Sequence, residues 1–181
     1  MTALFLIDQV PVDARFLGKS SFETKRASAN SFAPSEADKI IMGDEDEFRV
    51  LNLTVSVFND ASTSYHHHSI GGYSGAKMKR YQELIETSLS DDINSLITNL
   101  RTATTMEEAE GALGSLGILN MLNTRYIILD PGSAPLVNRH AAGNAWLVNR
   151  VTLAENADAE LLAVKTINPK EEAVVDRRFA E

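Results

Sequence analysis

A glycine-rich turn next to basic residues is the part of this chain best suited to ligand chemistry. Gly71, Gly72 and Gly75 are followed closely by Lys77 and Arg80. Glycines allow backbone N–H groups to approach a ligand, and a helix that starts beside them adds partial positive charge. This spacing predicts a site for a phosphate or a carboxylate. The same residues also suit a tight corner that seats a helix on a sheet, and both interpretations stay open.

Three adjacent histidines, residues 66–68, precede the turn. Neutral imidazole is the commonest zinc ligand, but neighbouring side chains of an extended chain point to opposite faces. At most two of the three could therefore share a metal, and a further ligand such as His140 would be needed. We expect no metal and no cofactor. The expected ligand-binding residues are His66, His68, Gly71, Gly72, Tyr73, Lys77 and Arg80.

Established catalytic motifs are missing from the sequence. Neither the phosphate-binding pattern G-x-x-x-x-G-K-[ST] nor the dinucleotide pattern G-x-G-x-x-G is present. Ser69 and Ser74 lie near histidines without a G-x-S-x-G elbow, so we assign no catalytic residue. Trp146 can be a core residue or a platform on which a sugar ring stacks.

The composition indicates a globular protein of one domain, residues 1–181. Hydrophobic residues make up 44% and charged residues 23% of the chain. The net charge of −8 argues against a nucleic-acid partner, which needs a basic surface. The chain has no cysteine, which excludes disulfides and thiolate metal sites. No apolar run approaches the roughly 20 residues of a membrane-spanning helix.

Strands alternate with helices along the chain, which predicts an α/β fold with a layered mixed sheet flanked by helices. The strand order is not specified by the pattern. Residues 18–33 show no period and are expected to form a surface excursion. The expected strands cover residues 4–7, 48–53, 125–129, 145–151 and 173–175. The expected helices start near residues 34, 74, 90, 105, 116 and 156.

Four motifs occur in a fixed order: Phe48-Arg49-Val50-Leu51-Asn52, the run from Thr63 to Tyr73, Lys77 with Arg80-Tyr81-Gln82, and Leu119 to Tyr126. With Asn138, Gly143-Asn144-Ala145-Trp146 and Val148, they resemble the YfhO family of bacterial polytopic membrane proteins over nearly the whole chain. Arg125, Leu147 and the triple histidine depart from the pattern without breaking it.

The resemblance implies that the chain is the extracytoplasmic portion of a longer inner-membrane protein, facing the periplasm or the cell exterior. Such proteins resemble multi-spanning glycosyltransferases that use lipid-linked sugars and modify surface polymers such as lipoteichoic acid. Their catalytic acid lies between membrane helices, so no catalytic residue is carried onto this chain. The resemblance thus implies that the chain supports sugar transfer from a polyprenyl-phosphate donor to a surface glycan.

The partners implied are the transmembrane part of the parent protein and a lipid-linked sugar or surface glycan. A non-catalytic interaction or scaffolding module is the alternative, and a metal-dependent hydrolase is a more distant one.

Overall fold

The computed structural model describes residues 2–18 and 21–180, with side chains from residue 9 onward. The chain divides into two compact units, Met1–Ala33 and Pro34–Glu181. All strands of the described chain belong to the second unit.

The first unit is helical. It contains α1 (Thr2–Phe16) and α2 (Lys25–Ser31), whose N-cap Thr24 accepts a hydrogen bond from the Ala27 amide at 3.1 Å. The predicted strand at residues 4–7 is wrong, because a short apolar run has the same appearance in a strand and in a helix. The predicted excursion at residues 18–33 does contain a helix, but none of the residues of α2 is buried.

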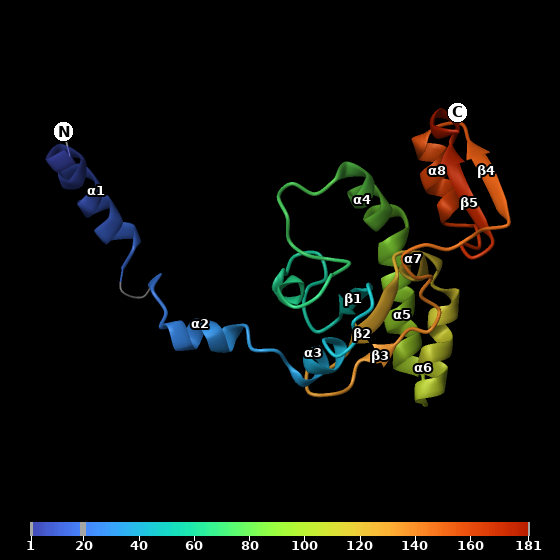
Figure 1. Cartoon of the computed structure of the whole chain (residues 1–181), viewed down its shortest axis with the longest axis horizontal. Helices are drawn as coiled ribbons and strands as arrows, with labels where there is room; N and C mark the ends of the chain where they lie inside the picture. Colours follow the sequence, from blue (N-terminus) through green and yellow to red (C-terminus); the bar gives the residue numbers. More distant parts are fainter. Residues whose placement is uncertain (1, 19–20, 181) are drawn as a thin grey trace. The chain divides into compact units, whose positions relative to one another are not determined.

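A mixed sheet of three strands organises the second unit (Figure 1). Strand β1 (Arg49–Asn52) pairs in parallel with β2 (Thr124–Ile128), and β2 pairs in antiparallel fashion with β3 (Leu136–Val137). The α/β prediction is therefore confirmed. The predicted strands at residues 48–53 and 125–129 correspond to β1 and β2.

One face of this sheet packs on the main core. Leu51 and Ile127 on this face belong to the same core cluster as Leu89 and Leu96 of the helical layer. That layer consists of α4 (Lys79–Leu84), the π-helix η3 (Ile85–Leu89), α5 (Ser90–Thr102), α6 (Met106–Ala112), the 3-10 helix η4 (Leu113–Ser115) and α7 (Gly117–Met121). The helices predicted near residues 74 and 90 are one continuous run, because residue 90 keeps helical backbone angles. The run begins only at Lys79.

The other face of the sheet is covered by α3 (Glu36–Ile41). Successive side chains of a strand point to opposite faces of the sheet. Val50 and Ile128 therefore point away from the main core and pack on Ala37 and Ile41. Ser35 and Asp38 form a capping box that starts this helix. The central strands are thus buried on both faces, as expected for a parallel pair.

A second, two-stranded parallel sheet completes this unit. Strands β4 (Arg150–Ala154) and β5 (Glu172–Asp176) are joined by α8 (Ala157–Val164), which Asn156 caps. The predicted strand at residues 145–151 is placed too early, since residues 145–149 are irregular. Two further short 3-10 helices of this unit are η2 (Ser62–Tyr65) and η5 (Arg177–Phe179). In the part of the chain that the structure describes, no helix is long and apolar enough to cross a membrane.

Candidate functional site

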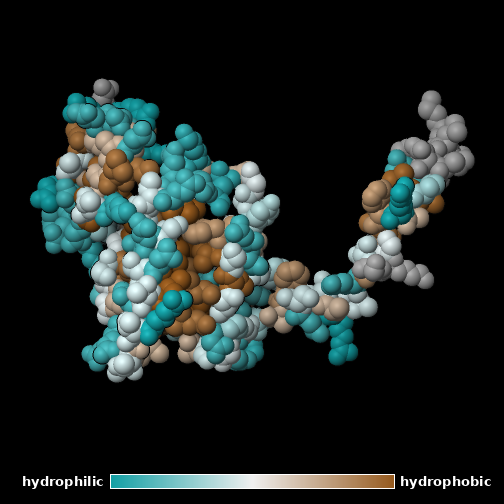
Figure 2. Space-filling view, turned by 180° about the vertical axis from the view of Figure 1, so that it is seen from behind, coloured by the Kyte–Doolittle hydropathy of each residue, from teal (hydrophilic) through white to brown (hydrophobic). Residues whose placement is uncertain are grey.

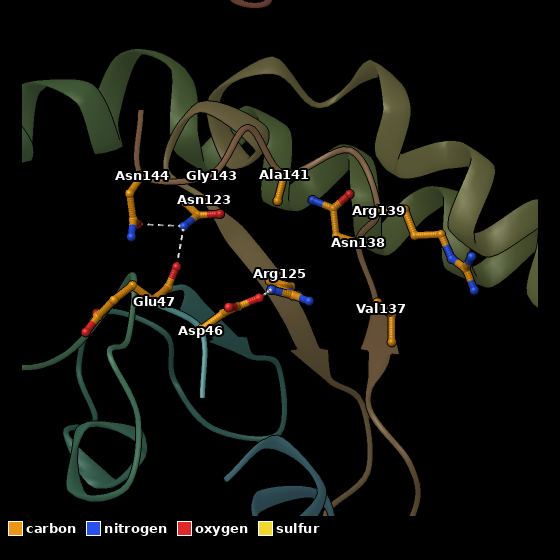
Figure 3. Close-up of a pocket in the computed structure, with 10 residues that line it drawn as sticks. All are labelled: Asp46, Glu47, Asn123, Arg125, Val137, Asn138, Arg139, Ala141, Gly143 and Asn144. Carbon is orange, nitrogen blue, oxygen red and sulfur yellow. Dashed lines mark hydrogen bonds and ion pairs between the residues drawn. The ribbon is translucent and has the colours of Figure 1, made fainter. Parts of the chain in front are cut away.

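A polar pocket of about 550 Å³ lies at the edge of the sheet where β1 and β2 begin and β3 ends. Figure 3 shows residues 138–144 crossing above the strands, with Asn123 and Asn144 meeting at one end and Arg139 at the other. The lining residues are Asp46, Glu47, Asn123, Arg125, Val137, Asn138, Arg139, Ala141, Gly143 and Asn144. Open α/β sheets usually bind ligands at the carboxyl ends of their strands, so this position is unusual.

Asn123 joins three separate segments at one end of the pocket. Its backbone φ of 56° lies in the left-handed region, which asparagine tolerates better than most residues and which ends α7 sharply. Its Nδ2 donates to the Glu47 carbonyl at 2.8 Å and to Asn144 Oδ1 at 3.0 Å. The loop before β1 and the loop after β3 are therefore tied to the start of β2.

Arg125 is held by two carboxylates on the wall of the pocket. Its guanidinium lies 2.7 Å from Asp46 and 3.3 Å from Asp44, and the hydrogen bond to Asp46 raises the pKa of Arg125 above its ordinary value. Tyr126 donates to Asp44 at 2.7 Å, and this bond lowers the pKa of the Asp44 carboxyl. These contacts fix the guanidinium in a charged, oriented state.

Buried amides form the floor. The side chain of Asn138, which is 2% exposed, donates to Asn120 Oδ1 at 2.7 Å and to the Thr124 carbonyl at 2.8 Å. Its Oδ1 accepts from the His140 amide at 3.0 Å. Asn120 in turn donates to the Leu113 carbonyl at 2.9 Å. Buried networks in which each polar atom is hydrogen-bonded are rigid, so the loop that follows β3 is held in place before any ligand arrives.

A second pocket of about 270 Å³ adjoins the first and shares four lining residues with it: Glu47, Asn123, Gly143 and Asn144. Its own lining includes the large side chains of Phe48, Met121 and Trp146. The indole of Trp146 is fixed by a hydrogen bond from Nε1 to the Pro169 carbonyl at 2.6 Å. Trp146 lies in the irregular segment before β4, not on a strand as predicted.

The lining of the larger pocket balances its charges, with two acidic and two basic residues. The hydrogen bond between the two asparagine side chains uses Asn123 Nδ2 and Asn144 Oδ1. Within the described chain, Asn123 Oδ1 and Asn144 Nδ2 make no hydrogen bond and are left for a ligand. The pocket therefore offers donors and acceptors side by side. This arrangement suits an uncharged ligand whose groups both donate and accept.

The glycine turn does not have the free backbone amides that an anion site would need. The Gly71 amide donates to Ser69 Oγ at 3.1 Å, and the Gly72 amide donates to the Val57 carbonyl at 2.7 Å. A Cβ on Gly71 would lie only 1.8 Å from the Val57 carbonyl oxygen, and Gly72 has a φ of 118°. Because α4 begins at Lys79, its N-terminus is not at the turn. These contacts fit the tight-corner interpretation.

The histidine run separates into three environments. His67, with only 4% of its side chain exposed, contacts Asp38 Oδ1 through Nε2 at 2.8 Å. His68 is exposed, lies 3.8 Å from Glu47 and lines the smaller pocket. His66 contacts Tyr65 and His67 by their rings. Among residues 2–18 and 21–180, no group of three or more His, Cys, Asp or Glu side chains is placed to hold a metal.

The other predicted site residues do not join the polar pocket. Tyr73 is exposed, and Lys77 Nζ lies 5.5 Å from the centre of the Phe58 ring. Arg80 pairs with Glu160 of α8 and borders a separate, mainly apolar pocket of about 400 Å³. Of the seven predicted residues, only His68 lines either of the two adjoining pockets.

Sequence reasoning missed the asparagines that make this site. Asn120, Asn123, Asn138 and Asn144 are spread over 25 positions and come together only because β2 and β3 pair. Their density between residues 120 and 144 was the available signal. Comparison of the chain with protein-family models, with curated proteins and with solved structures gives no match.

Proposed function

We propose that this chain is a non-catalytic sugar-binding domain, the extracytoplasmic portion of a YfhO-like membrane protein, and that it supports transfer of a sugar from a polyprenyl-phosphate donor to a surface glycan. The observation that carries the proposal is the charge-balanced, asparagine-lined pocket beside Trp146. In this account the pocket holds the glycan.

The chemistry of the lining favours a neutral sugar over a phosphate. A phosphate in the larger pocket would face the carboxylate of Asp46, and Arg125 is already engaged by Asp44 and Asp46. Sugar hydroxyls donate and accept, so they can use amide and carboxylate groups together. We therefore place the ligand among the asparagines and not at Lys77.

The rigidity of the pocket favours binding as well. Every polar side-chain atom of Asn120 and Asn138 makes at least one hydrogen bond, and Asn123 ties two loops to β2. A site that is already ordered loses little conformational entropy when a ligand binds. Weak, polar ligands such as sugars depend on this preorganisation.

Calorimetric titration of the full 181-residue chain tests the proposal. Glucose, galactose and N-acetylglucosamine are titrated separately, with inorganic phosphate as a comparison. We expect heat of binding with at least one sugar and none with phosphate. Asn144→Ala should weaken sugar binding about tenfold, because the change removes the side-chain amide that hydrogen-bonds to the ligand.

Asn94→Ala is the matched control, since Asn94 is exposed on α5 and distant in the sequence from both pockets. This variant should bind sugar as the wild type does. Absence of binding for every sugar, or equal effects of the two substitutions, would refute the proposal.

A non-catalytic interaction module remains the second candidate, and one observation favours it. Hydrophobic side chains before and on β4 are exposed, namely Leu147 at 96%, Val151 at 58% and Leu153 at 47%. Figure 2 shows further hydrophobic surface in the middle of the second unit, surrounded by hydrophilic residues. Such surface is typical of a docking face. This candidate predicts no sugar binding in the titration above.

A further inference from the structure

We infer that the two adjoining pockets are successive subsites of one groove, which binds a glycan through at least two linked sugar units. The inference rests on the proposed function and deepens it, because it specifies the length of the ligand. It starts from the four residues that line both pockets, which are Glu47, Asn123, Gly143 and Asn144.

The volumes indicate one extended ligand and not two independent ones. Ligand pockets typically measure about 300–1,000 Å³. The larger pocket, at about 550 Å³, lies within this range, whereas the smaller, at about 270 Å³, lies just below it. The smaller pocket is therefore better suited to extend a ligand that is anchored in its neighbour.

The two linings differ in the way that two parts of a glycan site would differ. The larger pocket is lined by charged and amide groups, which suit the hydroxyl edges of a sugar. The smaller one adds Phe48, Met121 and Trp146, which suit the apolar face of a ring, with Arg49 and His68 at its polar side. Anchoring by hydrogen bonds in one subsite is thus combined with stacking in the other.

Gly143, which lines both subsites, has open space beside its backbone. Gly143 has a φ of 81°, which favours glycine, and an added Cβ there would meet no atom within 4 Å. The adjacent side chain of Asn144 is oriented by its bond to Asn123. A glycosidic linkage passing this point can therefore contact the backbone closely.

The test compares each monosaccharide with its disaccharide on the full chain by calorimetry. The probes are glucose with cellobiose and maltose, and N-acetylglucosamine with chitobiose. We expect the disaccharide of the preferred sugar to bind about tenfold more tightly than the monosaccharide, because stacking at a second subsite adds to the anchoring interaction. Equal affinity of the two would overturn the inference and leave the proposed function standing.

Substitutions in the lining of the smaller pocket test whether the gain in disaccharide affinity comes from this subsite. His68→Ala changes an exposed side chain, and Trp146→Leu removes the aromatic ring. Both should reduce the disaccharide-to-monosaccharide affinity ratio to about threefold or less, whereas Asn94→Ala should keep the wild-type ratio. Dispersed amide signals in the NMR spectrum establish that each variant is folded.

A ratio that is unchanged in both pocket variants would refute the second subsite. Absence of binding by every sugar would instead refute the proposed function together with the inference.

Discussion

The glycine turn and the asparagine pocket contrast in how they use their polar groups. In the turn, the amides of Gly71 and Gly72 donate to Ser69 and Val57, so both donors are already hydrogen-bonded within the protein. In the pocket, the amides of Asn123 and Asn144 keep groups that face open space. In this chain a glycine-rich signature thus specifies a corner, while the pocket is formed by dispersed residues that the fold brings together.

The largest effect on stability is expected for a substitution of Gly71 in the glycine turn. Gly71→Ala places a methyl group 1.8 Å from the Val57 carbonyl oxygen. The corner must then shift, and we expect the free energy of unfolding in urea to fall by about 3 kcal/mol.

The control for this change is Gly75→Ala. A Cβ at Gly75 would meet no atom within 4 Å. The free energy of unfolding should stay within about 0.5 kcal/mol of the wild type. If Gly71→Ala were equally harmless, the turn would not be a required corner.

A smaller loss is expected at the floor of the pocket. Asn138→Ala leaves the Thr124 carbonyl and Asn120 Oδ1 without their donor. Burial of unpaired acceptors should lower the free energy of unfolding by about 2 kcal/mol and weaken sugar binding. Asn94→Ala, the same chemical change on the exposed side of α5, should alter neither quantity. Wild-type stability of Asn138→Ala would show that the amide network does not hold the pocket.

Acid titration probes the histidine run beside the turn. Burial raises the pKa of Asp38. The hydrogen bonds from Ser35 and the contact with His67 lower it by more, so the pKa lies below its ordinary value. A lowered folded-state pKa stabilises the fold above the unfolded pKa of about 4, and this stabilisation is lost as the pH falls through the folded pKa.

Asp38→Asn removes this titration. The stability difference between the wild type and this variant should therefore shrink as the pH is lowered from about 5 to about 2. Urea unfolding at several pH values measures it. A difference that stays constant over this range would mean that the Asp38 carboxylate contributes no pH dependence.

The smallest effect is expected at Lys77, in the predicted anion site. Its contact with the Phe58 ring is worth about 0.5–1 kcal/mol, so Lys77→Ala should cost no more than this in unfolding free energy. Sugar affinity should be unchanged. If Lys77→Ala weakened binding more than Asn144→Ala does, the ligand would lie at the turn and not in the pocket.

Much of the fold was predictable because its signals are local. Asn156 and Thr105 cap helices as their side chains suggest, and the runs around β1 and β2 are rich in strand-forming residues. The strand at residues 4–7 was wrong because its apolar run has no distinguishing period. The helix break at Ser90 was wrong because a π-turn carries the helix through the preceding residues.

The site was not predictable from local patterns. Asn138 reaches Asn120 across 18 positions, and Asn123 reaches Glu47 across 76. Such contacts depend on strand pairing, and asparagine by itself indicates only a turn or a cap. The role of Asn123 at the pocket follows only from β1 lying beside β2.

Mapping of amide chemical shifts on the full 181-residue chain, during titration with the preferred disaccharide and separately with inorganic phosphate, tests the central claim most directly. We predict that the disaccharide shifts amides within residues 46–49, 123–125 and 138–146, that residues 69–77 stay unchanged, and that phosphate shifts neither group. Shifts confined to residues 69–77, or no shifts with any sugar, would contradict the assignment of the ligand site to the asparagine pocket.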